Sequence, residues 1–224
     1  LWFVSVSYGG WAGSAINQIS SKDGGLGWSP VERIVTSPFI NISTLVRNPP
    51  LPLTDGGIAL PVYHEFISKH PEWLRFDERG RLLGKSHPAA SSHSLQPAAV
   101  ALDGLRAVML LRDAGPLQRI RASASDDGGR HWSSPVPTAL PNSNAGIALL
   151  RLADGRLLLA YNPQTANRNR LGLSVSGDEG RHWSPPWMIE DGAEDDEYSY
   201  PALLQDEQGD IHLAYTWKRQ RIQH

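Results

Sequence analysis

The stretch Ser125-Asp126-Asp127-Gly128-Gly129-Arg130-His131-Trp132 fits the pattern Ser-x-Asp-x-Gly-x-x-Trp, which occurs three times in this chain. The other copies run from Ser21 to Trp28 and from Ser176 to Trp183, and each copy is followed by Ser. Ser and Asp side chains hydrogen-bond the backbone of tight turns, and Gly supplies the positive φ that such turns require. The Trp can then bury its ring at the start of the next strand. Each copy therefore predicts a hairpin turn, and we expect a structural role for its Asp: Asp23, Asp127 and Asp178.

The spacing of the copies indicates a longer repeat. Ser125 and Ser176 are 51 positions apart, and Ser21 and Ser125 are 104 apart, about twice as far. A degenerate copy is expected between the first two, and residues 74–80 keep an Asp and a Gly between two short β-like runs at that point. A period near 50 is the size of one four-stranded propeller blade.

A second repeated unit alternates with these turns. An apolar strand, a turn around Asp and Gly and a second apolar strand recur at residues 50–63, 97–111, 147–161 and 201–215. Apolar runs on both sides of a polar turn are typical of inner strands that are buried on both faces. The sequence therefore predicts an all-β propeller of four-stranded blades, with blades at 36–90, 91–137 and 138–190 and partial blades at 1–35 and 191–224.

Composition narrows the possible functions. The 224 residues carry a formal net charge of -2, which gives no electrostatic case for a nucleic-acid or anionic-membrane partner. No apolar run is long enough for a membrane-spanning helix. Cysteine is absent, which excludes disulfides and thiolate metal sites and leaves the compartment and the oligomeric state open. The chain starts inside an apolar run without Met, so we expect any signal peptide to lie upstream or to have been removed.

The octapeptide resembles the Asp box of the sialidase (neuraminidase) superfamily, which joins the outer two strands of a blade. Several other stretches resemble its bacterial and plant predicted neuraminidases, namely residues 4–13, 43–47, 60–65, 197–201 and 215–217. The resemblance spans essentially the whole chain. Because sialidase propellers have six blades, it implies that residues 1–224 form one incomplete propeller domain of about four to four and a half blades.

The resemblance implies an exo-acting glycoside hydrolase for sialic acid or another acidic sugar. Such enzymes grip the sugar carboxylate with three arginines and use a Tyr activated by a Glu as nucleophile, together with an acid Asp. Tyr198 fits the nucleophile by its local context, and Tyr200 is the substitute, since it would share a strand face with Tyr198. Glu65 ends an inner strand, with His64 beside it, and is a better candidate than Glu197 for the glutamate that activates the tyrosine. Glu197 would point away from Tyr198.

Two arginines are expected to bind the substrate. Arg47 precedes an inner strand and loosely resembles the sialidase Arg-Ile-Pro element, and Arg112 ends another inner strand. A third arginine is missing at the next strand entries, where Gln96 and Asn144 stand instead and are expected to hydrogen-bond sugar hydroxyls. Basic residues near the end of the chain, such as Arg219, fit a solvated outer strand better than a sugar site.

Two further functions stay open at this point. One is a non-catalytic carbohydrate-binding propeller that kept the boxes and lost the arginines. The other is a polysaccharide lyase that uses His64 or a Tyr as base against uronic acids. We expect no cofactor and no metal, because His70, His87 and His93 show no ligand spacing, and the acidic run 194–197 fits a solvated loop better than a Ca²⁺ site.

Overall fold

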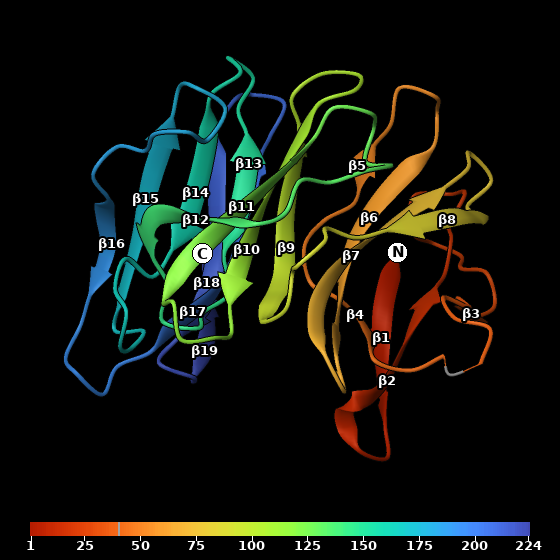
Figure 1. Cartoon of the computed structure of the whole chain (residues 1–224), viewed down its shortest axis with the longest axis horizontal. Helices are drawn as coiled ribbons and strands as arrows, with labels where there is room; N and C mark the ends of the chain where they lie inside the picture. The colour runs from red at the N-terminus through yellow and green to blue at the C-terminus, as the bar shows by residue number, and fades with distance from the viewer. Residues whose placement is uncertain (40) are drawn as a thin grey trace.

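A computed structural model describes residues 1–39 and 41–224, and these residues form nineteen β-strands in five antiparallel sheets (Figure 1). No helix occurs among them, so no described segment is a helix long and apolar enough to cross a membrane. The sheets follow one another along the chain, as successive blades of a propeller do. The chain thus contributes five blades or partial blades, which corrects the count of four to four and a half.

The strand bounds follow the repeat. The first sheet contains β1 (Trp2–Ser7), β2 (Gly10–Gln18) and β3 (Glu32–Arg33). The second contains β4 (Thr44–Val46), β5 (Leu51–Pro52), β6 (Ile58–Glu65), β7 (Lys69–Phe76) and β8 (Leu82–Ser86). The third contains β9 (Ser94–Ala101), β10 (Ala107–Asp113), β11 (Arg119–Ser125) and β12 (Val136–Pro141). The fourth contains β13 (Ala148–Arg151), β14 (Leu157–Tyr161), β15 (Arg170–Ser176) and β16 (Trp187–Asp191), and the fifth contains β17 (Tyr198–Gln205), β18 (Ile211–Trp217) and β19 (Arg221–Gln223).

The inner strands of the middle sheets are apolar on both faces because the second, third and fourth sheets each pack between two others. Leu110 and Leu111 are neighbours on β10 and point to opposite faces. Leu110 joins a core with Leu149 and Leu159 of the fourth sheet, and Leu111 joins a core with Trp73 of the second. Both leucines are fully buried. The predicted pairs of inner strands are confirmed as β5–β6, β9–β10, β13–β14 and β17–β18.

The Asp boxes form the turns before the last strand of a sheet: between β2 and β3, between β11 and β12, and between β15 and β16. In the box after β11, Ser125 Oγ accepts a hydrogen bond from the Gly129 amide at 2.9 Å, and Asp127 Oδ1 accepts one from the His131 amide at 2.9 Å. Gly129 has φ +79°, and a Cβ there would collide with the indole nitrogen of Trp73. Glycine is therefore required by the backbone and by the packing. The other two boxes repeat these Ser and Asp bonds.

The degenerate copy predicted at residues 74–80 is also a turn of this kind. It joins β7 to β8, and Asp77 Oδ1 accepts hydrogen bonds from the amides of Arg79 and Arg81 at 3.0 and 2.8 Å. It lacks the tryptophan, so what it shares with the full boxes is the Asp-braced turn alone.

The three box tryptophans follow equivalent turns but differ in burial. Trp132 is 8% exposed and packs edge-to-face on Trp73, with ring centroids 5.0 Å apart. Trp183 is partly buried against the core between the third and fourth sheets. Trp28 is 50% exposed, and its indole donates to the Gly25 carbonyl, as that of Trp183 does to Gly180. Burial of the box tryptophan thus depends on its contacts with the neighbouring sheet that comes earlier in the chain.

Replacement of a box tryptophan by alanine is expected to cost stability in proportion to burial. Trp132→Ala removes a buried aromatic ring and should lower the free energy of unfolding by about 3–5 kcal/mol. Trp28→Ala removes the same side chain from a half-exposed position and should cost about 1 kcal/mol or less. Urea denaturation of the two variants measures both values, and equal losses would contradict this account of the packing.

The box carboxylates should make folding sensitive to acid. Burial raises the pKa of Asp127, but the hydrogen bonds from the His131 amide, the His131 ring and Ser125 outweigh it and lower this pKa to about 2. Because the unfolded value is about 3.9, Asp127 contributes stability at neutral pH that is lost as pH falls from about 5 toward 2. Asp127→Asn is expected to reduce stability at neutral pH and to flatten that acid dependence. Denaturation midpoints across this range measure it, and parallel curves for the two proteins would contradict it.

Candidate functional site

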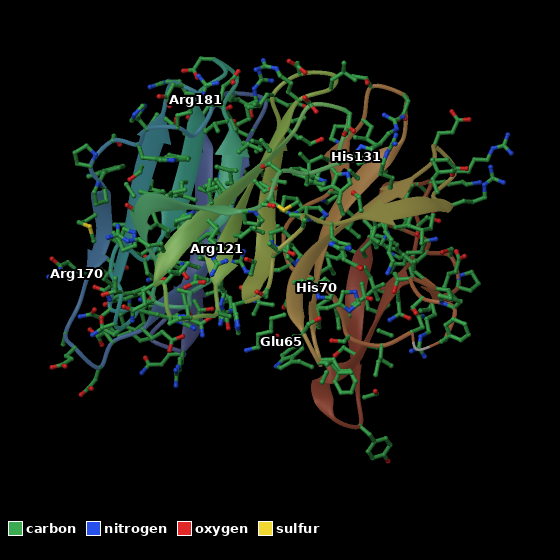
Figure 2. The ribbon with its side chains drawn as sticks, viewed as in Figure 1. Glu65, His70, Arg121, His131, Arg170 and Arg181 are labelled. Carbon is green, nitrogen blue, oxygen red and sulfur yellow. The ribbon has the colours of Figure 1, made fainter. Side chains whose placement is uncertain are left out.

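A cavity of about 1160 Å³ opens where the inner strands of successive sheets meet. Its polar wall includes five predicted site residues, namely Arg47, Glu65, Gln96, Arg112 and Tyr200. Its apolar wall includes Trp2, Phe3, Val4 and Trp11 of the first sheet, together with apolar residues of the second, fourth and fifth sheets. Figure 2 shows Glu65 near one end of the sheets and Arg181, from an Asp box, near the other. The cavity is large enough for a sugar ring.

Bulges direct two polar-wall residues toward the cavity. On β9, Gln96 and Pro97 together oppose the single residue Leu111, and on β17, Tyr200 and Pro201 oppose Tyr215. Gln96 and Tyr200 have φ values of +49° and +54°. A bulge re-aims a side chain, and positive φ at non-glycine residues is a strain that concentrates at functional sites.

Arg47 lies against neutral oxygens. Its Nη1 donates to Asn48 Oδ1 and to the Ile147 carbonyl, both at 2.7 Å, and its Nη2 donates to the Pro201 carbonyl at 2.8 Å. These acceptors come from the second, fourth and fifth sheets. Loss of hydration lowers the pKa of Arg47 to about 10, so the side chain still carries its charge at neutral pH.

Arg112 is held by Gln96 and Asn144, the two residues that the sequence analysis found in place of a third arginine. Its Nε donates to Asn144 Oδ1 at 2.7 Å, and its Nη1 donates to Gln96 Oε1 at 3.0 Å. Loss of hydration lowers its pKa as well. Among the described residues, no carboxylate lies within ion-pair distance of Arg47 or Arg112. Gln96 and Asn144 therefore position an arginine, in addition to any contact they make with a sugar.

A third arginine, which the sequence reasoning missed, reaches the same region from the loop between β14 and β15. Arg168 Nη2 donates to the Asn144 carbonyl at 2.7 Å. The guanidinium groups of Arg168 and Arg47 each lie 5.7 Å from the centre of the Tyr200 ring. Tyr200 is 45% exposed between these two charges. Arg112 marks the end of the second strand in its sheet, and inspection of the loop after the second strand of the next sheet would have found Arg168.

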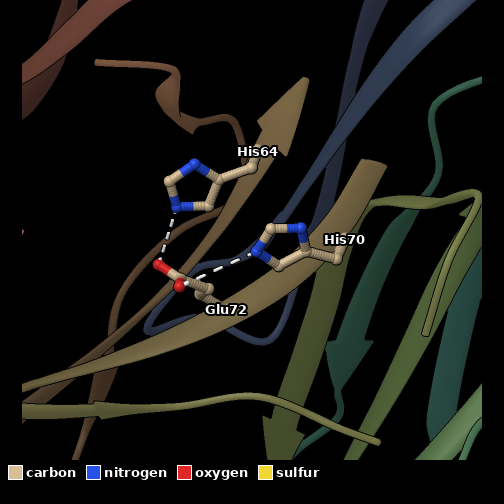
Figure 3. Close-up of side chains that lie close together, drawn as sticks. All are labelled: His64, His70 and Glu72. Atoms are coloured by element: carbon tan, nitrogen blue, oxygen red, sulfur yellow. Dashed lines mark hydrogen bonds and ion pairs between the residues drawn. The ribbon is translucent and has the colours of Figure 1, made fainter. Parts of the chain in front are cut away.

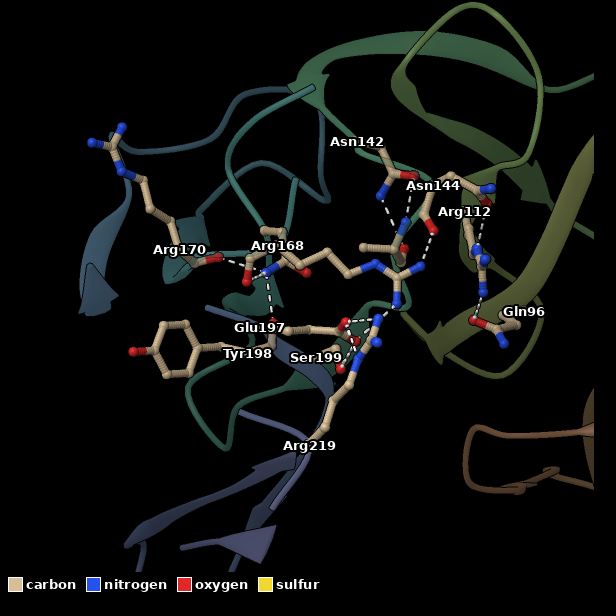
Figure 4. A network of polar contacts seen from close by, with 12 residues as sticks. Gln96, Arg112, Asn142, Asn144, Arg168, Arg170, Glu197, Tyr198, Ser199 and Arg219 are labelled. Atoms are coloured by element: carbon tan, nitrogen blue, oxygen red, sulfur yellow. Dashed lines mark hydrogen bonds and ion pairs between the residues drawn. The ribbon is translucent and has the colours of Figure 1, made fainter. Parts of the chain in front are cut away.

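Tyr198, the predicted nucleophile, does not line the cavity. It is 3% exposed and packs with Leu171 and Tyr215, and its hydroxyl donates to Asp196 Oδ2 at 3.4 Å. Figure 4 shows its ring directed away from Arg168 and Arg112. The sequence placed Tyr198 and Tyr200 on one strand face, but the bulge between Ser199 and Ala202 breaks the alternation. Tyr200 therefore takes the place expected for Tyr198.

Glu197 forms a network beside the cavity. Its carboxylate accepts hydrogen bonds from Ser199 Oγ at 2.8 Å and from Arg219 Nε at 2.6 Å, and it lies 3.4 Å from Arg168 Nη1. Burial raises the pKa of Glu197, but these hydrogen bonds and charges lower it on balance. Arg219, for which the sequence analysis favoured a solvated strand, is exposed. It also helps to hold Arg168 in place, because both arginines contact the Glu197 carboxylate.

The predicted pair His64 and Glu65 is divided between two faces of β6. Glu65 lines the cavity, and its amide donates to Ser43 Oγ. Tyr63, two residues before it, also lines the cavity and accepts a hydrogen bond from Gln96 Nε2 at 3.4 Å. His64 points to the other face, where its Nε2 lies 2.8 Å from Glu72 Oε2. His64 is therefore not placed as a base for a substrate in this cavity.

The five sheets, the Asp-box turns and the arginine-lined cavity define the class of protein: an Asp-box propeller. The sequence matches the family model of the BNR repeat-like domain over residues 1–213, and the chain belongs to this family, within the sialidase superfamily. None of the curated proteins matches the sequence.

Several solved structures share the fold. The NanB sialidase of Streptococcus pneumoniae is similar with a TM-score of 0.74 at 16% identity, over 91% of this chain and 32% of that one. The intramolecular trans-sialidase of Ruminococcus gnavus gives 0.73 at 19% identity, over 94% and 48%. A protein of unknown function from Dyadobacter fermentans gives 0.69 at 18% identity, over 96% and 62%. The chain thus spans about a third to a half of the length of these two sialidases.

Gly146 leaves the space in which the Arg47 guanidinium lies, and a side chain there is expected to disturb it. A Cβ at this position would lie 3.0 Å from Arg47 Nε and 3.0 Å from Gln96 Oε1. Gly146→Ala should therefore destabilise the protein by about 1–3 kcal/mol. Gly84→Ala, where no atom lies within 4 Å of the added Cβ, should change stability by less than about 0.5 kcal/mol. Thermal and urea denaturation compare the two, and similar effects would contradict the crowding at Gly146.

Proposed function

We propose that this chain forms the sugar-binding part of a sialidase-like glycoside hydrolase that holds sialic acid or another acidic sugar by its carboxylate. The observation that supports this most is the environment of Arg47 and Arg112. Both side chains are half-buried and have lost part of their hydration, and their hydrogen bonds go to neutral oxygens only. A charge in such a setting is costly without a counter-ion, and guanidinium groups bind carboxylates in a bidentate manner.

The proposed binding mode uses the charges around Tyr200. Arg47 and Arg112 contact the sugar carboxylate, and Arg168 adds the third positive charge. Gln96 is held by Arg112 and turns its amide nitrogen toward Tyr63. The apolar wall from the first sheet faces the less polar parts of the sugar. The whole protein would complete a ring of six blades, and its substrate and linkage depend on parts of the ring beyond these five sheets.

For catalysis, we assign Tyr200 as the nucleophile and Glu65 as the base. The Tyr200 oxygen forms a bond to the anomeric carbon while Glu65 takes the phenol proton, and the bond to the leaving oxygen breaks, so that this oxygen takes a proton from the solvent. Water then attacks the anomeric carbon and the bond to Tyr200 breaks. Glu65 returns its proton to the Tyr200 oxygen, and the attacking water releases a proton to the solvent. A neutral phenol suits this role because it does not repel the carboxylate on the anomeric carbon.

Hydrolysis of an aryl α-sialoside tests the assignment, since its leaving group departs as a stable phenolate without a general acid. Tyr200→Phe is expected to lower the rate by more than about 100-fold. Tyr198→Phe is the matched control, because it removes the same hydroxyl outside the cavity, and it should retain the rate. Fluorophore release measures both. A loss confined to Tyr198→Phe would return the role to Tyr198.

Carboxylate recognition is tested separately from turnover. Arg112→Met is expected to weaken binding of free sialic acid by about 30-fold or more, whereas Arg181→Met, at the other end of the sheets, should leave it unchanged. Isothermal titration calorimetry measures the affinities. Binding with no hydrolysis would favour a non-catalytic carbohydrate-binding propeller, and loss of neither binding nor rate in Arg112→Met would contradict the proposed site.

A further inference from the structure

Two histidines and a glutamate gather on the face of the second sheet that points away from the cavity. His64 of β6 pairs directly with His70 of β7, and Glu72 follows two positions later on the same face. Figure 3 shows the three side chains converging. His64 Nε2 lies 2.8 Å and His70 Nε2 lies 3.8 Å from the oxygens of the buried Glu72 carboxylate. One donor atom from each residue falls within 4.8 Å of the others.

The contacts within this cluster suit a metal ion. The buried Glu72 carboxylate lies beside both imidazole rings and the Lys85 ammonium group. His70 Nδ1 lies 2.9 Å from Ser68 Oγ. When Nδ1–H donates to that hydroxyl, the lone pair of Nε2 faces Glu72. Outer partners of this kind orient histidine ligands.

We propose that His64, His70 and Glu72 bind a divalent first-row transition metal ion, with zinc as the representative, and that water completes the coordination. Two imidazole nitrogens and one carboxylate are a zinc ligand set that leaves a fourth position free. At zinc bond lengths of about 2.0–2.2 Å the donor atoms lie about 3.3–3.5 Å apart. The rings therefore close by about 1.5 Å at most, which their position beside the exposed turn 66–68 allows.

Lys85 competes with the ion for Glu72. Its Nζ donates to Glu72 Oε1 at 3.1 Å, and the side chain is 40% exposed. A metal ion at the carboxylate compensates the charge of Glu72 and repels this ammonium group, which can turn into solvent because the Lys85 side chain is partly exposed. This competition separates a metal site from a purely ionic cluster. In an ionic cluster Lys85 stabilises the group, whereas in a metal site it weakens binding of the ion.

Bound metal would also stiffen the strand that carries the proposed base. His64 and Glu65 are adjacent on β6 and point to opposite faces, so an ion that bridges His64 to β7 fixes the strand end from which Glu65 enters the cavity. The two sites are otherwise separate, and binding of the ion does not depend on catalysis.

Zinc titration of the chelator-treated protein tests the proposal. The wild-type chain is expected to bind one Zn²⁺ saturably, with a rise in melting temperature, and Co²⁺ in its place should give the visible bands of tetrahedral coordination. His64→Ala and His70→Gln should lose this binding. Ser68→Ala should weaken it by about 10- to 100-fold. Lys85→Ala should tighten it by about fivefold.

His131→Ala is the matched control, because His131 is an exposed histidine beside a carboxylate, Asp127, in an Asp box. It should bind Zn²⁺ as the wild type does. Circular dichroism checks that each variant is folded. If His64→Ala does not fold, His70→Gln alone tests the site. No saturable binding by the wild type, or unchanged binding by His70→Gln, overturns the site. An unchanged or weaker affinity in Lys85→Ala overturns the role of Glu72 as the third ligand.

Discussion

Burial of the inner strands on both faces is the constraint on which the rest of the structure depends. A strand such as β10 sends Leu110 into one core and Leu111 into the next, so its sheet is stable only between two others. Sheets stacked in this way bring the ends of their inner strands together. The cavity is a consequence, since residues far apart in the sequence, such as Arg47 and Tyr200, come to share one wall.

Several features in and around the cavity are energetically unfavourable, and the packing of the surrounding sheets stabilises them. Two arginines have lost hydration without a carboxylate partner, and Gln96, Asn144 and Tyr200 have positive φ. Hydrogen bonds to carbonyl and amide oxygens of neighbouring sheets hold the charges in place. Under the proposed function, this arrangement is preorganised for an anion, because the packing of the sheets offsets the cost of desolvation and strain before any ligand binds.

Much of the fold could be predicted from the sequence, because its signals are local. Ser, Asp, Gly and Trp at fixed offsets specify one turn, and the turn recurs at a constant period, so the boxes, the inner hairpins and the degenerate turn at Asp77 were all predicted. The burial of each box tryptophan could not be predicted in the same way. Trp132 and Trp28 end copies of the same box pattern, and what separates them is the sheet against which each ring packs.

By itself, the sequence determined that the chain is a propeller of Asp-box repeats, and it named most of the polar residues of the cavity wall. The tertiary structure decided how they are combined. Because of the bulge on β17, Tyr200 lines the cavity and Tyr198 does not. The loop after β14 places Arg168 beside Tyr200. Pairing of β6 with β7 gathered His64, His70 and Glu72, whose spacing along the chain fits no familiar ligand motif. Bulges and strand pairing depend on contacts between segments that are distant in the sequence. The alternation of apolar and polar residues along one strand therefore does not predict them.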